Sequence, residues 1–176
     1  MKIPFSPPYI DDDVKREVLQ ALDSGWITSG PKVLALEKLV AQQVGINHVA
    51  CCNSATSGLM LLLHWYGVTR GDEVIIPAYT YAATALVVMH LGATPVLVDS
   101  GPDFNIDVNK IRDKITSKTK VIMPVDIAGW PCDYKQISTL VNEPEVKSRF
   151  KPASKNQQQV GRILILSDAA HSIGAH

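Results

Sequence analysis

The chain has 176 residues, of which 46% are hydrophobic and 19% charged, and its formal net charge is zero. This length supports a core of domain size, and the composition is typical of globular proteins. A neutral chain gives no electrostatic basis for binding nucleic acid or an anionic membrane, and no apolar run reaches the roughly 20 residues of a membrane span. The three cysteines do not have the spacing of metal ligands, and the N-terminus lacks the apolar segment of a signal peptide. Both features favour a cytoplasmic location.

The first 45 residues predict two helices, over residues 11–24 and 31–44. The first carries apolar side chains at near-helical spacing behind aspartates that suit a helix N-terminus. The second has Pro31 at a favourable first position, and a glycine follows each helix. We interpret residues 1–45 as an N-terminal helical segment and residues 25–30 as a shaped loop within it.

Short β-rich runs alternate with helical stretches from residue 46 onward. The expected strands are residues 48–52, 73–76, 95–98, 120–125 and 162–167, and the expected helices are residues 56–66, 81–91, 107–115 and 133–141. Strands that are apolar throughout and alternate with helices predict an α/β fold, with a mostly parallel sheet and helices on both faces. The polar stretch 142–161 is expected to be a surface insertion.

Ligands bind beyond the carboxyl ends of the strands in such a sheet, so the residues after each strand are the candidate site. After the first strand, Thr56 and Ser57 open a helix whose N–H groups and hydroxyls can bind a phosphate. An ordinary helix cap by Ser54 or Thr56 explains the same residues. After the second strand, Tyr79 and Tyr81 can stack on a planar ring, or pack in a core or interface.

The last two strands end in carboxylates. Asp126, followed by Trp130, is expected either at the rim where substrate reaches it or as the cap of a turn. Asp168 can pair with a protonated ring nitrogen, with His171 beside the ring or orienting the carboxylate. A hydrolytic triad would need a G-x-S-x-G nucleophile elbow, which the sequence does not contain. No third metal ligand stands at useful spacing, so we expect no metal. Together the strand ends describe a site for a phosphorylated, planar, nitrogen-containing ring.

Several blocks along the chain resemble the DegT/DnrJ/StrS family of pyridoxal-phosphate (PLP)-dependent sugar aminotransferases, which has the aspartate-aminotransferase fold (type I). The blocks are Ile3-Pro4-Phe5 and residues 24–31 (SGWITSGP), 53–57 (NSATS), 71–77 (GDEVIIP), 92–96 (GATPV) and 168–171 (DAAH). The resemblance implies PLP as cofactor and the PLP-binding large domain of that fold over residues 46–176.

The resemblance also implies a role for each cofactor-binding candidate. Thr56 and Ser57 would bind the PLP phosphate, and Tyr81 would stack on the pyridine ring. Asp168 would bond the pyridine nitrogen, and His171 would lie beside the ring.

For the substrate, the resemblance places the loop with Trp26, Thr28 and Gly30 at the border of the pocket. Asp126, where relatives often have a histidine, is the further substrate-binding candidate. The implied reaction moves an amino group, usually from glutamate, onto a nucleotide-linked keto sugar for surface polysaccharide or other amino-sugar biosynthesis. The implied assembly is a homodimer with shared active sites.

The lysine that carries PLP as a Schiff base lies beyond the Asp168 position in relatives. Here no lysine follows Asp168, and the last one is Lys155. We therefore expect a truncated large domain, without its C-terminal strands and the small domain, that holds no catalytic residue and is inactive alone. The alternatives are a sugar dehydratase of the same family, with histidine in place of the lysine, and a non-catalytic fragment or interaction module.

Overall fold

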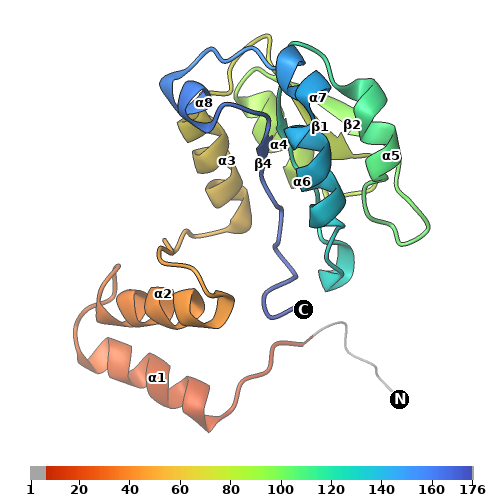
Figure 1. The fold of residues 1–176 in the computed structure, drawn as a ribbon. Coiled ribbons are helices and arrows are strands. Elements are labelled where there is room, and N and C mark those ends of the chain that lie inside the picture. The colour runs from red at the N-terminus through yellow and green to blue at the C-terminus, as the bar shows by residue number, and fades with distance from the viewer. Residues whose placement is uncertain (1–6, 176) are drawn as a thin grey trace. The chain divides into compact units, whose positions relative to one another are not determined.

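The computed structural model describes residues 7–175, so the block Ile3-Pro4-Phe5 lies outside the described residues. The chain forms two compact units, Met1–Cys51 and Cys52–His176. Figure 1 shows the elements of both in chain order. Among the described residues, no helix combines the length and the apolar character that a membrane crossing requires.

The first unit consists of the two helices that the sequence predicts, α1 (Asp12–Asp23) and α2 (Pro31–Val44). Asp11 caps α1, because its carboxylate accepts a hydrogen bond from the N–H of Val14 at 2.9 Å. Gly45 ends α2 in the left-handed conformation that glycine adopts without steric cost. Neither helix has a fully buried side chain.

The second unit contains a four-stranded parallel sheet. Its strands are β1 (Glu73–Pro77), β2 (Thr94–Val98), β3 (Thr119–Ile122) and β4 (Leu164–Ile165), in the order β2-β1-β3-β4. All three described strand pairs are parallel, which confirms the predicted α/β fold. The two central strands, β1 and β3, are buried almost throughout, as expected for strands covered on both faces.

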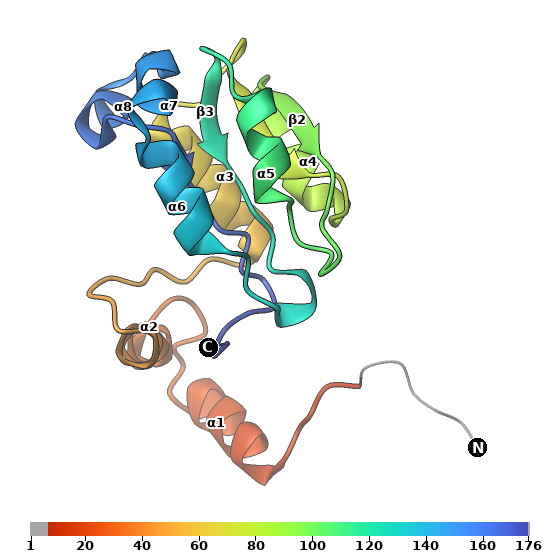
Figure 2. The same cartoon turned by 45° about the vertical axis from the view of Figure 1, so that its right-hand side comes forward.

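Helices cover both faces of this sheet. They are α3 (Ala55–Tyr66), α4 (Ala82–His90), α5 (Val108–Ile111) and α6 (Tyr134–Asn142), with the short 3₁₀ helix η1 (Arg112–Lys114) directly after α5. The chain moves from β1 to β2 in one direction and from β2 to β3 and β4 in the other. Right-handed crossovers therefore place α4 opposite α5 and α6, and Figure 2 shows α3 and α4 behind the sheet with α5 and α6 in front.

The strand order reverses between β1 and β3, because β2 lies on one side of β1 and β3 on the other. In open α/β sheets the crevice beyond such a switch point is where ligands bind. The segment after β3 continues into the 3₁₀ helix η2 (Ile127–Gly129) at this end of the sheet. The topology thus locates the candidate site independently of any motif.

The expected strand over residues 48–52 is wrong, because these residues form no strand. The N–H of Cys51 donates instead to the carboxylate of Glu37 at 2.8 Å. A strand needs a neighbour for its ladder bonds, and none of the described strands pairs with this apolar run. The last expected strand, residues 162–167, shortens to β4 plus an isolated bridge between Val125 and Asp168.

The expected surface insertion over residues 142–161 is mostly exposed, and it forms two further helices, α7 (Pro144–Arg149) and α8 (Lys155–Val160). Gln157 on α8 is completely buried. Its side chain accepts from the N–H of Ala153 at 2.8 Å and donates to the carbonyl of Gly67 at 3.3 Å. A buried glutamine with both ends bonded anchors this polar segment, which composition alone assigns to the surface.

Candidate functional site

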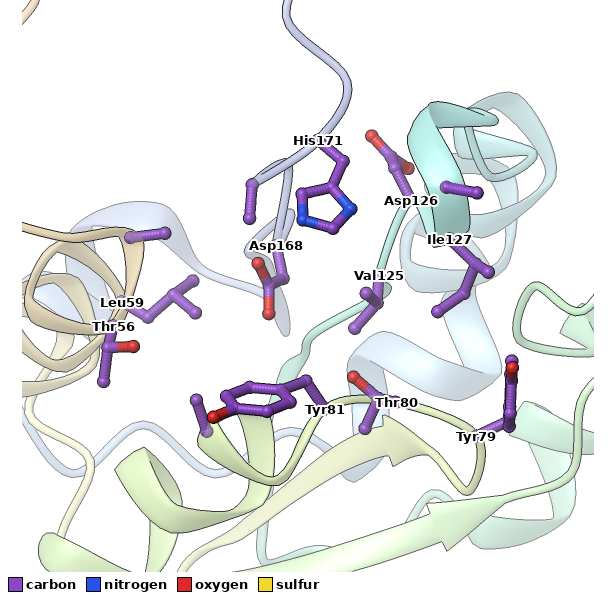
Figure 3. A pocket seen from close by; sticks show the side chains of 14 residues that line it. Thr56, Leu59, Tyr79, Thr80, Tyr81, Val125, Asp126, Ile127, Asp168 and His171 are labelled. Carbon is purple, nitrogen blue, oxygen red and sulfur yellow. The ribbon is translucent and has the colours of Figure 1, made fainter. Parts of the chain in front are cut away.

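A pocket of about 620 Å³ lies at the carboxyl ends of β1, β3 and β4, within the second unit. Its lining comes from the start of α3, the turn before α4, and the segments that follow β3 and β4. Figure 3 shows it from close by; the residues are Ala55, Thr56, Leu59, Tyr79, Thr80, Tyr81, Ala83, Val125, Asp126, Ile127, Ala128, Asp168, Ala170 and His171. The pocket coincides with the crevice that the strand order predicts.

The N-terminus of α3 forms one side of the pocket. Ser54 caps the helix, and its hydroxyl accepts from the N–H of Ser57 at 3.1 Å and lies 3.0 Å from the Ser57 hydroxyl. The N–H groups of Ala55 and Thr56, in the first turn, have no intrahelical partner. The Thr56 side chain lines the pocket (Figure 3). This helix end therefore combines N–H groups, a hydroxyl and the positive end of a helix dipole, which suits an anion.

Asp168 lies on the segment that extends β4 alongside β3. Its N–H donates to the carbonyl of Pro124 at 2.8 Å, and its carbonyl accepts from the N–H of Asp126 at 3.2 Å. The side chain is buried at 8% exposure. Its Oδ2 accepts from the hydroxyl of Thr84 at 2.9 Å, and the carboxylate points into the pocket on the side of Tyr81 (Figure 3). A buried carboxylate in this position attracts a cationic group.

Tyr81 and His171 offer rings between the helix end and the carboxylate. Tyr81 is the N-cap residue of α4, and its side chain is 82% exposed although it lines the pocket. Figure 3 shows the Tyr81 ring on the opposite side of Asp168 from the imidazole of His171. The apolar side chains of Leu59 and Val125 complete the lining. Such walls suit a flat ring better than a strongly hydrated group.

Asp126 is buried at the pocket wall, and donors occupy both of its carboxylate oxygens. Oδ1 accepts from the N–H of Cys132 at 3.0 Å and from the hydroxyl of Tyr134 at 2.6 Å. Oδ2 accepts from the hydroxyl of Ser172 at 2.6 Å. Burial and the bond to this carboxylate raise the pKa of Tyr134, and burial beside Asp126 raises the pKa of Cys132 to about 12. Asp126 thus ties the segment after β3 to the segment carrying Asp168.

Asn105 and Gly129 fix the same wall from two other directions. The buried side chain of Asn105 accepts from the N–H of Ile127 at 3.2 Å and donates to the carbonyl of Trp130 at 3.0 Å. Gly129 has a φ of 83°, and a Cβ there would stand 2.8 Å from the carbonyl oxygen of His171. Only glycine allows the two segments to approach this closely.

The structure brings six of the sequence-predicted site residues to one pocket: Thr56, Tyr79, Tyr81, Asp126, Asp168 and His171. Ser57, the other predicted phosphate-binding residue, follows Thr56, and its N–H and hydroxyl are engaged with Ser54.

Three further candidates, Trp26, Thr28 and Gly30, belong to the first unit. There the indole N–H of Trp26 donates to the carbonyl of Ser29 at 2.8 Å, and a Cβ on Gly30 would come within 2.2 Å of the indole ring. The loop between α1 and α2 is therefore built around Trp26, and Gly30 must lack a side chain there.

The sequence did not identify three hydroxyl residues that hold the site together: Thr84, Tyr134 and Ser172. Thr84 is a completely buried polar residue on a helix that is otherwise mostly apolar. Tyr134 directly follows Asp133, the expected first residue of a helix. Ser172 directly follows His171, the expected neighbour of the ligand ring. A polar residue on the core face of a helix, or next to a site residue, is the signal that finds them.

Comparison with known proteins assigns the chain to a family. The family model described as the DegT/DnrJ/EryC1/StrS aminotransferase family matches residues 8–148. GDP-perosamine synthase from Caulobacter vibrioides is 38% identical over 99% of this chain and 43% of its own length. The spore coat polysaccharide biosynthesis protein SpsC from Bacillus subtilis is 36% identical over 97% of this chain and 40% of its own length.

Among solved structures, the putative sugar aminotransferase Spr1654 from Streptococcus pneumoniae superimposes with a TM-score of 0.94 at 44% identity. The match covers 99% of this chain and 44% of that chain, in both the PLP form and the PMP form. The chain thus spans about two fifths of the length of the curated relatives described above. It belongs to the DegT/DnrJ/EryC1/StrS aminotransferase family.

Proposed function

We propose that the pocket of the second unit binds PLP and that the whole protein is a sugar aminotransferase. The observation that carries the proposal is the buried carboxylate of Asp168, which points into a pocket whose other end is the N-terminus of α3. Membership of an aminotransferase family, and the likeness to a sugar aminotransferase with PLP and PMP forms, support it.

The residues present fit three parts of PLP: its phosphate, a face of its pyridine ring and its ring nitrogen. The first turn of α3, with Thr56, suits the phosphate, and the exposed ring of Tyr81 suits one face of the pyridine. Asp168 matches the ring nitrogen, because a buried carboxylate stabilises a proton held there. The pocket volume of about 620 Å³ is within the usual range for small-molecule sites.

Bound PLP supplies an electron sink that allows an amino group to leave one carbon and join another. The chain's own residues hold and shield it. Asp168 keeps a proton at the ring nitrogen, and Thr56 binds the phosphate. Tyr81 and Leu59 exclude water from the ring, and Asp126 holds the segment with His171 in place through the hydroxyl of Ser172.

We further propose a nucleotide-linked keto sugar as acceptor and glutamate as amino donor, in surface polysaccharide or related amino-sugar synthesis. The names of the GDP-perosamine synthase and of SpsC support this substrate class. Trp26, Thr28 and Gly30 are proposed to border the sugar site. A homodimer is proposed because α3 and α4, which contact each other, carry exposed apolar side chains. The free, exposed thiols of Cys51 and Cys52 suit the cytoplasm.

Calorimetric titration with PLP tests the cofactor proposal. We expect saturable binding to the chain and a loss of roughly tenfold in affinity for Asp168→Asn, because the amide carries no charge for the ring nitrogen. Asp99→Asn is the matched control: this aspartate also follows a strand, but its side chain is 75% exposed and outside the pocket. Equal affinities of the two variants would refute the role of Asp168.

The proposed reaction is tested in the whole protein with PLP, a nucleotide-linked keto sugar and glutamate. Aminotransfer predicts 2-oxoglutarate and amino sugar in equal amounts, with no turnover when glutamate is omitted. Loss of water from the sugar without consumption of glutamate would show a dehydratase instead.

A further inference from the structure

We propose that Thr84 is a positioning residue, which fixes the Asp168 carboxylate so that its second oxygen faces the ring nitrogen of the cofactor. The inference rests on the proposed PLP site, and it assigns a task to a residue that does not line the pocket. Thr84 lies in the first turn of α4 and is completely buried.

The hydroxyl of Thr84 lies between two other side chains. Its Oγ1 is 2.9 Å from Oδ2 of Asp168 and 2.8 Å from Oγ1 of Thr80. Thr80 lines the pocket beside Tyr81 (Figure 3). The three side chains thus form a short hydrogen-bonded chain from the pocket wall, through the buried start of α4, to the carboxylate.

Chemistry fixes the direction of this chain of hydrogen bonds. An ionised carboxylate only accepts hydrogen bonds, so the Thr84 hydroxyl donates to Asp168. A hydroxyl has one proton, which means that Thr84 must accept from Thr80. The bond to the charged oxygen is of the stronger, charge-assisted kind, and the second bond polarises it further.

This arrangement leaves one oxygen of Asp168 for the ligand. Oδ2 is held by Thr84, and within residues 7–175 no hydrogen bond of the protein reaches Oδ1. Holding one oxygen sets the rotation of the carboxylate, and the other oxygen is then presented to the pocket in one orientation. Asp126, where donors occupy both oxygens, has no such oxygen to offer.

An ordinary helix role does not explain the Thr84 hydroxyl. A threonine hydroxyl in a helix can bond a backbone carbonyl earlier in the same helix. Here the hydroxyl reaches a side chain 84 residues away in sequence. Replacing the hydroxyl with a methyl group of similar size therefore removes the contact with Asp168 while keeping the packing.

The test compares PLP with 1-deazapyridoxal 5′-phosphate, in which a carbon replaces the ring nitrogen, by calorimetry on the chain. For Thr84→Val we expect PLP affinity to fall roughly tenfold, the size of one hydrogen bond to a charged group. Affinity for the deaza compound should change less than about twofold, because that ring offers Asp168 no nitrogen. Thr84→Ser, which keeps the hydroxyl, should restore PLP affinity to within about twofold of the original.

Val87→Ala is the control for general damage, because Val87 is completely buried on the same helix and carries no hydroxyl. It should weaken both ligands equally or neither. If Thr84→Val also weakens the binding of both ligands equally, or leaves the preference for PLP unchanged, Thr84 has a structural role only. The inference about Thr84 then fails, while the PLP site stands. If the unaltered chain binds no PLP, or binds both compounds alike, Asp168 meets no ring nitrogen and the proposed site fails with it.

Discussion

Two buried carboxylates at the same pocket differ in the donors around them. Within residues 7–175, the carboxylate of Asp126 accepts three hydrogen bonds, whereas the carboxylate of Asp168 accepts one, from Thr84. The first therefore joins two segments of protein, and the second retains an oxygen for a ligand. Both residues stand at strand ends in the sequence, and the donors that Cys132, Tyr134 and Ser172 place around Asp126 separate their roles.

Asp126→Asn should destabilise the fold by about 2 to 3 kcal/mol, because the amide nitrogen would face a donor in a buried site. Unfolding in urea measures the change. Asp99→Asn, at an exposed ion pair with Lys110, should cost less than about 1 kcal/mol. Similar losses in the two variants would mean that the three bonds to Asp126 do not stabilise the native state.

Gly129→Ala tests the close approach of Gly129 to the carbonyl of His171, and Gly71→Ala is the control for backbone strain alone. Gly71 also has a positive φ, of 94°, but a Cβ there meets nothing within 4 Å. Both substitutions should cost roughly 1 kcal/mol from the left-handed backbone. Gly129→Ala should cost at least about 1 kcal/mol more, because its Cβ must push the His171 carbonyl away. Equal losses in urea unfolding would contradict the tight approach of the two pocket segments.

At the scale of elements, polar segments contribute to the packing as well as the apolar strands. The stretch with α7 and α8 looks like an insertion by composition, yet it buries Val146 and Gln157. Ser154, the cap of α8, donates its hydroxyl to the carbonyl of Tyr66 at 2.8 Å and so connects α8 to the end of α3. Because α3 begins at the pocket and ends here, this contact helps to hold the helix that carries Thr56.

Gln157→Ala should destabilise the protein by about 2 to 3 kcal/mol, since it leaves the N–H of Ala153 and the carbonyl of Gly67 without their partner. Its neighbour Gln158 is exposed, so Gln158→Ala should change the free energy of unfolding by less than about 0.5 kcal/mol. Thermal unfolding of the two variants compares their stabilities. Equal melting temperatures would mean that α8 is only loosely attached to the rest of the unit.

At the scale of the whole molecule, the alternation of strands and helices was sufficient to predict the α/β class. The rule that ligands bind beyond strand ends located Tyr79, Tyr81, Asp126, Asp168 and His171 at the pocket. Thr56 also lines the pocket, although the strand expected before it does not form. The strand over residues 48–52 could not be excluded from sequence, because pairing depends on a neighbour and not on the apolar run itself. Thr84 and Ser172 were missed because their bonds to Asp168 and Asp126 span 84 and 46 residues. Periodicity does not encode such contacts.

The buried ionisable groups predict a loss of stability at alkaline pH. Burial raises the pKa of Cys132 from 9.0 and that of Tyr66 from 10.0 to about 12 in each case, and it also raises the pKa of Tyr134. A raised native pKa means that the unfolded chain loses its proton first. The stabilisation is complete below pH 9 and falls above it by about 1.4 kcal/mol per pH unit for each titrating group.

Urea unfolding between about pH 8 and 11 measures this slope. Between pH 9 and 10 the loss comes mainly from Cys132, so Cys132→Ala should flatten that part of the curve. Cys51→Ala, at an exposed cysteine, should leave the slope unchanged. A slope that Cys132→Ala does not alter would contradict the buried, protonated thiol beside Asp126.

A crystal structure of the chain grown with PLP tests most directly whether a PLP site lies between the start of α3 and Asp168. We predict density for the cofactor in the pocket lined by Thr56, Tyr81 and Asp168, with its phosphate at the first turn of α3. An empty pocket with PLP attached only to surface lysines would contradict it.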